Sequence, residues 1–181
     1  MGRTGFRREG AGPLTPIFLE KSERLTESKD MLDYTTLTKT ITALTEGETD
    51  AVALMATVAC EVHQADDRFD WTGFYRVVAP ELLKIGPYQG GHGCLVIPFS
   101  RGVCGACART GEVQLVPDVE AFPGHIACAS STRSELVLPV RNGAGDVIAV
   151  FDIDSDQADA FTETDAVQMQ VILDQVFELA Q

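Results

Sequence analysis

The apolar positions of the chain follow two different periods. Up to about residue 64 they recur at helical spacing, and Gly47 separates a first predicted helix, beginning near Met31, from a second over roughly residues 50–64. From residue 71 onward the apolar segments have strand length and are bounded by glycine, proline, asparagine or aspartate. The predicted strands are WTGFYRVV, ELLKIGPY, CLVIPF, VQLVPD, ELVLPVRN and DVIAVFDID.

Turn and cap residues predict how these elements are connected. The last two strands flank RNGAGD, which predicts an antiparallel hairpin, and RGVCGACARTG predicts a short helix that opens after Gly102. A closing helix is predicted from the N-cap Thr162, with Asp165 three residues later. The apolar side of that helix is predicted to be Val167, Val171, Val176 and Leu179. This order predicts an α+β fold, with helices packed against a central antiparallel β-sheet.

The first 30 residues differ from the rest. They are rich in glycine, proline and arginine and show no apolar period, which predicts a disordered N-terminal extension, residues 1–30, before one domain over residues 31–181. The early arginines raise the question of a targeting role, but the glutamates that follow them disfavour a transit peptide.

The charge of the chain excludes several classes of partner. The 181 residues include 14 Lys+Arg and 27 Asp+Glu, so the formal net charge is −13. Such a chain is repelled by nucleic acid and by anionic membrane surfaces. The sequence shows no apolar run of the ~18 residues that span a bilayer and no signal-peptide pattern, so we expect a cytoplasmic protein.

Five cysteines are the first candidates for chemistry. Their odd number and the lack of a secretory signal disfavour a structural disulfide framework. Cys60, among helical apolar neighbours, is expected to be a small buried hydrophobe. Cys94, Cys104 and Cys128 lie in or beside loops, where functional residues concentrate. Redox chemistry, zinc binding and inert thiols are the three interpretations left open.

Local context bears on the thiols. Cys104 lies between glycines near a predicted helix N-terminus, which favours a thiolate, and His125 precedes Cys128 by three residues, where an imidazolium lowers a thiol pKa. Cys104 and Cys107 have CxxC spacing, and His92 and His125 supply imidazoles, but no second cysteine pair completes a zinc knuckle. The same CGAC has the spacing of a redox dithiol, in antiparallel rather than βαβ surroundings.

Three acidic residues form a second cluster. Glu135 begins one hairpin strand, and Asp152 and Asp154 lie two residues apart near the end of the other, so both aspartates point to one face of the sheet. Carboxylates on an otherwise apolar strand need partners. They predict a pocket for a cationic group or for a shared proton, or else a solvated strand end.

Six segments, taken together, resemble those of a known protein family: WTGFY, IGPYQG, IPFSRGVCG, VQLVPDVEAFPGHIAC, SELVLPV and VFDIDS. In this order, and with the three loop cysteines, they resemble the free methionine-(R)-sulfoxide reductases, which are stand-alone GAF-domain enzymes. The resemblance runs from about Leu37 to Val176. It implies a GAF domain over residues 31–181, reduction of free L-methionine (R)-S-oxide to methionine, and regeneration by thioredoxin or a similar dithiol protein. No metal or organic cofactor is implied, and a homodimer stays open.

The resemblance also implies roles for single residues. Cys94, Cys104 and Cys128 match the redox cysteines. Trp71 and Tyr75 match the aromatic wall around the substrate's methyl and thioether end, and Glu135, Asp152 and Asp154 match the acidic ligand-binding residues. The chain departs from the family pattern in two places, since Ala129 stands where an acidic residue is common and Cys107 where a small residue without a thiol is common.

We expect Cys128 to be the attacking thiol and Cys94 its main resolving partner, while Cys104 is the competing nucleophile. A part for Cys107 in the relay stays open. Two other classes of function remain as alternatives, a GAF sensor that binds a small ligand without catalysis and a zinc-stabilised interaction domain.

Overall fold

The computed structural model describes residues 1, 32–125 and 130–181. Apart from Met1, the predicted extension over residues 1–30 lies outside the described residues, and so does Cys128. Within the described ranges, no helix is long and apolar enough to cross a membrane.

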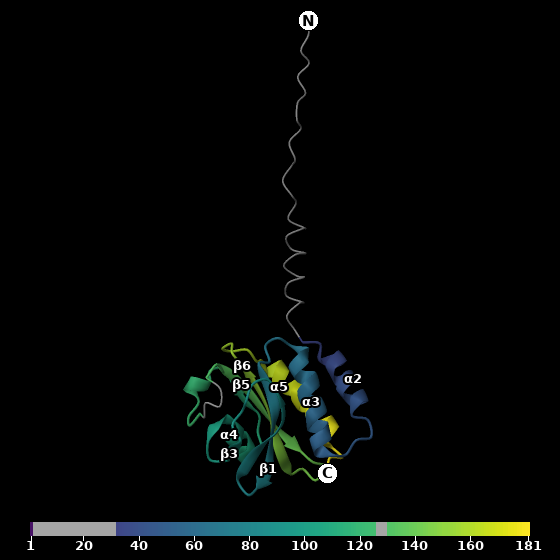
Figure 1. Ribbon diagram of the computed structural model, residues 1–181, viewed down its shortest axis with the longest axis vertical. Coiled ribbons are helices and arrows are strands. Elements are labelled where there is room, and N and C mark those ends of the chain that lie inside the picture. Colours follow the sequence, from purple (N-terminus) through teal and green to yellow (C-terminus); the bar gives the residue numbers. More distant parts are fainter. Residues whose placement is uncertain (2–31, 126–129) are drawn as a thin grey trace. The chain divides into compact units, whose positions relative to one another are not determined.

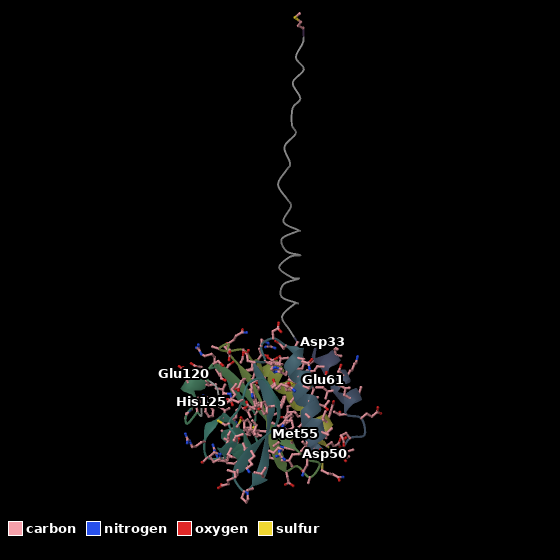
Figure 2. The ribbon with its side chains drawn as sticks, in the orientation of Figure 1. Asp33, Asp50, Met55, Glu61, Glu120 and His125 are labelled. Atoms are coloured by element: carbon pink, nitrogen blue, oxygen red, sulfur yellow. The ribbon has the colours of Figure 1, made fainter. Side chains whose placement is uncertain are left out.

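Aspartates cap the first two described helices. The second begins where predicted, whereas the first begins at Tyr34 rather than near Met31. In α2 (Tyr34–Leu44) the N-cap Asp33 accepts a hydrogen bond from the Thr36 N–H at 3.1 Å. In α3 (Ala51–Ala65) the N-cap Asp50 accepts from the Ala53 N–H at 2.8 Å. Figure 2 labels both capping residues. Each cap satisfies an amide that has no partner within its helix.

Each predicted strand segment overlaps one strand of a single antiparallel sheet, with ends that differ by a few residues. The strands are β1 (Trp71–Ala79), β2 (Leu82–Gln89), β3 (Val96–Pro98), β4 (Gln114–Val116), β5 (Ser134–Arg141) and β6 (Val147–Ser155). Their order in the sheet is β3-β2-β1-β6-β5-β4, and each neighbouring pair is antiparallel. The other elements are α4 (Gly102–Thr110), η1 (Val119–Ala121) and α5 (Glu163–Phe177). The predicted α+β fold is confirmed.

The two faces of the sheet are covered differently (Figure 1). Helix α3 packs on β1 and β2, and α5 packs on β5, while α4 contacts β3, β5 and β6. Strand alternation sends Phe74 and Phe151 to the face of α5, where the Phe74 ring lies 4.5 Å from Phe151 and 5.7 Å from Phe177, centroid to centroid. The opposite face, toward α4, carries Trp71 and Tyr75, which belong to a buried hydrophobic cluster that includes Val103 and Cys107 of α4.

The predicted apolar side of the last helix is wrong. Thr162 is its N-cap, in a capping box with Asp165, as expected. However, Val167, Val171 and Leu179 are 58%, 43% and 71% exposed. The buried residues of α5 are Asp165, Ala166, Met169, Ile172, Leu173 and Phe177. These positions also have helical spacing, and packing against the sheet selects the stripe with the larger side chains.

One polar junction joins α2, the segment before β1 and α5. The Asp165 carboxylate accepts hydrogen bonds from Tyr34 Oη at 2.6 Å, from Arg68 Nη2 at 3.2 Å and from the Thr162 N–H at 2.7 Å. Burial raises the pKa of Asp165, but the hydrogen bonds from Arg68, Tyr34 and Thr162 outweigh it and hold that pKa below its usual value. The charged carboxylate therefore stabilises the fold.

Asp165→Asn is expected to lower the free energy of unfolding by about 2 kcal/mol at neutral pH, because the amide keeps one acceptor oxygen for Thr162 but loses the charge that pairs with Arg68 and the second acceptor oxygen. A depressed pKa gives stability that is complete above the unfolded-state value of about 3.9 and is lost as the pH falls through the folded-state value. The deficit should therefore shrink on acidification. Urea unfolding at several pH values measures it, with Asp174→Asn on the same helix as control; equal losses for both variants would contradict the assignment.

Candidate active site

The sheet register gathers the acidic residues. Asp154 on β6 lies opposite Glu135 on β5 and opposite Trp71 on β1. Asp152, two residues earlier, lies on the same face opposite Val137 and Gly73. Both aspartates thus lie on one face of the sheet, as their i, i+2 spacing predicted, and strand pairing adds Glu135 and Trp71 in one row with Asp154.

One cavity brings together the predicted site residues that the structure describes, except Cys94. Its lining includes Trp71, Tyr75, Cys104, Glu135, Asp152 and Asp154. The remaining lining residues are His92, Gly93, Ile97, Gly102, Val103, His125 and Thr132. Sequence reasoning assigned the two histidines to zinc or thiol activation, and it missed Ile97, Val103 and Thr132, which carry no motif of their own. Figure 2 shows His125 near Glu120, on the opposite flank from Glu61 of α3.

The aromatic wall extends further than predicted. The Trp71 ring stacks on Tyr75 at 5.7 Å and on Tyr88 at 5.4 Å, centroid to centroid. The Trp71 indole N–H donates to the Gly91 carbonyl at 3.0 Å, which fixes the loop after β2 against the wall. A Cβ at Gly93 would lie 2.7 Å from Tyr75 Oη, so only glycine lets this loop approach so closely.

Helix α4 places the Cys104 thiol beside the Asp152 and Glu135 carboxyls. Gly102 begins the helix with a φ of +72°, and Cys104 is its third residue. The Cys104 thiol donates to Asp152 Oδ2 at 3.2 Å and lies 3.9 Å from Glu135 Oε1. A Cβ at Gly105 would lie 2.6 Å from the Pro98 carbonyl oxygen. This glycine therefore permits close packing of the helix on the backbone after β3.

The carboxyls hold different proton affinities. Glu135 and Asp152 are only 6% and 5% exposed. Burial, followed by the charge of Asp152, raises the pKa of Glu135 well above its usual value. Burial raises the pKa of Asp152 to about 6, against hydrogen bonds from Cys104 and Glu135 that lower it. Burial and the Asp152 charge also raise the pKa of Asp154 well above its usual value. Asp152 is thus the first of the three to ionise.

The expectation of a Cys104 thiolate is wrong. Burial, and then the Asp152 and Glu135 charges, raise the pKa of the Cys104 thiol well above its ordinary value. The partial positive charge of a helix N-terminus is about half an elementary charge, and buried carboxylates within 4 Å outweigh it. The Cys104 thiol therefore keeps its proton and donates a hydrogen bond to Asp152.

The other thiols differ in state. Cys94 is disulfide-bonded, whereas Cys60, Cys104 and Cys107 are free. Cys107, on the next turn of α4, is fully buried, and burial raises its pKa. Cys60 is only half-buried and accepts a hydrogen bond from Gln64 Nε2 at 2.9 Å, so the prediction of a small buried hydrophobe is wrong there.

The zinc interpretation of the CxxC pair does not match the geometry. The group of potential metal ligands found in the described ranges combines Cys104 with Glu135 and Asp152, and it includes neither Cys107 nor a histidine.

Comparisons with known proteins agree with this architecture. The GAF domain family model matches residues 34–177. The free methionine-R-sulfoxide reductase of Escherichia coli is 37% identical over 145 residues, which cover 79% of this chain and 86% of that protein.

Two solved structures are similar along most of their length. The free methionine-R-sulfoxide reductase of Neisseria meningitidis, in complex with its substrate, is 39% identical, with a TM-score of 0.75 over 81% of this chain and 89% of that chain. The reduced form of fRMsr of Staphylococcus aureus is 33% identical, with a TM-score of 0.79 over 83% of this chain and 97% of that chain.

Proposed function

Because the chain belongs to the GAF domain family, within which it is similar to free methionine-R-sulfoxide reductases, we propose that it reduces free L-methionine (R)-S-oxide to L-methionine. The observation that carries the proposal is the cavity in which a thiol, three carboxyls and two stacked aromatic rings meet. Such a cavity suits a small zwitterion with an apolar methyl thioether end.

The differing proton affinities of the carboxyls divide their roles. Asp152, the most acidic of the three, accepts a hydrogen bond from Cys104 and serves as the carboxylate that attracts the substrate ammonium. Glu135, whose pKa burial raises well above the usual value, holds its proton more tightly than Asp152 and serves as the general acid. Trp71 and Tyr75 contact the methyl group.

The proposed reduction of the sulfoxide has three steps. The Cys128 thiolate attacks the electrophilic sulfur and forms an S–S bond while Glu135 protonates the sulfoxide oxygen. The resulting hydroxyl group then passes from the methionine sulfur to the Cys128 sulfur, the S–O and S–S bonds to the methionine sulfur break, methionine leaves, and Cys128 becomes a sulfenic acid. The Cys94 thiol then displaces the hydroxyl, which leaves as water, and a disulfide forms. An external dithiol, thioredoxin or a similar protein, reduces that disulfide. The raised pKa of the Cys104 thiol supports Cys128 over Cys104 as nucleophile.

The test compares the free R-sulfoxide, its S epimer and peptide-bound sulfoxide, with dithiothreitol as reductant. Only the free R-sulfoxide is expected to react efficiently, because a peptide lacks the ammonium that pairs with Asp152. N-acetylmethionine sulfoxide is the matched control, since it removes only that charge. Equal rates on the free and peptide-bound forms would contradict the proposal, and binding without turnover would indicate a sensor.

A further inference from the structure

One thiol and two carboxyls meet at a single point of the cavity. The Cys104 sulfur lies 3.2 Å from Asp152 Oδ2 and 3.9 Å from Glu135 Oε1, and one ligand atom from each of the three residues lies within 4.8 Å of the others. Sulfur and oxygen ligands at about 2.3 and 2.0 Å from a tetrahedral zinc ion lie about 3.5 Å apart. Of the two observed distances from the Cys104 sulfur, the one to the Asp152 oxygen is slightly shorter and the one to the Glu135 oxygen slightly longer than this sulfur–oxygen separation.

A second observation comes from Asp152 itself. Its side chain lines the cavity and is 95% shielded from solvent, and one carboxyl oxygen accepts from Cys104. The other, Oδ1, has no hydrogen-bond partner in the described part of the chain. A buried carboxyl oxygen without a partner is costly, and a bound cation would satisfy it.

We propose that Cys104, Glu135 and Asp152 form a binding site for a zinc-class divalent cation, and that occupation of this site excludes the substrate. One thiolate and two carboxylates suit Zn²⁺ or Cd²⁺, whereas Mg²⁺ and Ca²⁺ prefer oxygen ligands alone. Three protein ligands leave a fourth position open toward the cavity.

Occupation changes the groups that the proposed chemistry uses. The cation displaces the Cys104 proton and any proton held by Glu135 or Asp152, and these leave to solvent. The general acid is then lost, and the carboxylate that attracts the substrate ammonium is neutralised. Zinc therefore acts as a reversible inhibitor; this consequence rests on the proposed function, whereas the binding itself does not.

The binding test is a titration of the purified chain, in its Cys94 disulfide form, with CdCl2. We expect one Cd²⁺ per chain and the ultraviolet absorption of a cadmium–thiolate bond. Cys104→Ser should lose that absorption, and Asp152→Asn should bind about tenfold or more weakly while circular dichroism shows both folded. Cys60→Ser, which changes a free thiol on α3, is the matched control and should behave as the wild type. Retention of the absorption by Cys104→Ser, or its absence in the wild type, would overturn the proposal.

Competition is measured separately from binding. Free methionine sulfoxide should weaken Cd²⁺ binding to the wild type, and Zn²⁺ but not Mg²⁺ should reduce the methionine released by pre-reduced protein without added thiol. If free methionine sulfoxide does not change the cadmium absorption, the claim that the bound metal excludes the substrate is overturned. If the metal-free protein releases no methionine but the cadmium titration gives the thiolate absorption, the proposed function fails and the metal site stands. If the metal-free protein releases methionine but the titration gives no such absorption, the metal site fails and the proposed function stands.

Discussion

Cys128→Ser is expected to release no methionine, even in a single turnover, because the substitution removes the attacking sulfur. Cys94→Ser is expected to release about one methionine per chain and then stall, since the sulfenic acid forms but lacks its main resolving partner. The measurement is methionine released per chain in the absence of reductant, followed by a count of free thiols. The wild type should release about one methionine and lose two thiols.

The remaining cysteines provide the controls. Cys60→Ser should turn over normally, because the half-buried Cys60 thiol lies on α3 and not in the lining of the cavity. Cys107→Ser is expected to be active as well, since its buried thiol has a raised pKa and does not attack. If Cys107→Ser instead stalls after one turnover, the CGAC pair belongs to the relay. Full release by Cys128→Ser together with none by Cys104→Ser would make Cys104 the nucleophile, and full release by both would exclude the mechanism.

Local signals predicted the elements well, because each depends on neighbours in the chain. The alternating period around Asp152 and Asp154 placed both on one face of β6, and Thr162 with Asp165 predicted the start of α5. The buried stripe of α5 was not predictable in this way. Valines and larger apolar residues both recur at helical spacing there, and only packing against the sheet decides between them.

The state of Cys104 shows what local reasoning leaves out. Its place near the start of a helix was predicted, and it favours a thiolate when considered alone. Its pKa is raised first by burial and then by the charges of Asp152 and Glu135, which lie 48 and 31 residues away in the sequence. Only the pairing of β5 with β6 brings them to the thiol, so the reversal of its expected pKa shift required the tertiary structure.

The second large effect is expected from Glu135→Gln, which should lower kcat by ~10²-fold or more, because glutamine keeps the shape and hydrogen bonding of the side chain but cannot donate the proton. Asp146→Asn, an exposed acid in the turn before β6, is the matched control and should leave turnover unchanged. A near-normal rate for Glu135→Gln would mean that another group protonates the oxygen.

The pH dependence tests the same role with an independent readout. Because burial raises the pKa of Glu135, its acid form persists to a higher pH than that of an ordinary glutamate, and wild-type turnover should fall as the pH rises through that raised pKa. Glu135→Gln should lose this alkaline limb while keeping any limb that reports thiolate formation. Above the raised pKa the buried charge also destabilises the folded state, so the variant should unfold no more easily than the wild type there. A variant that is both slow and clearly less stable at alkaline pH would show that Glu135 supports the structure rather than the proton transfer.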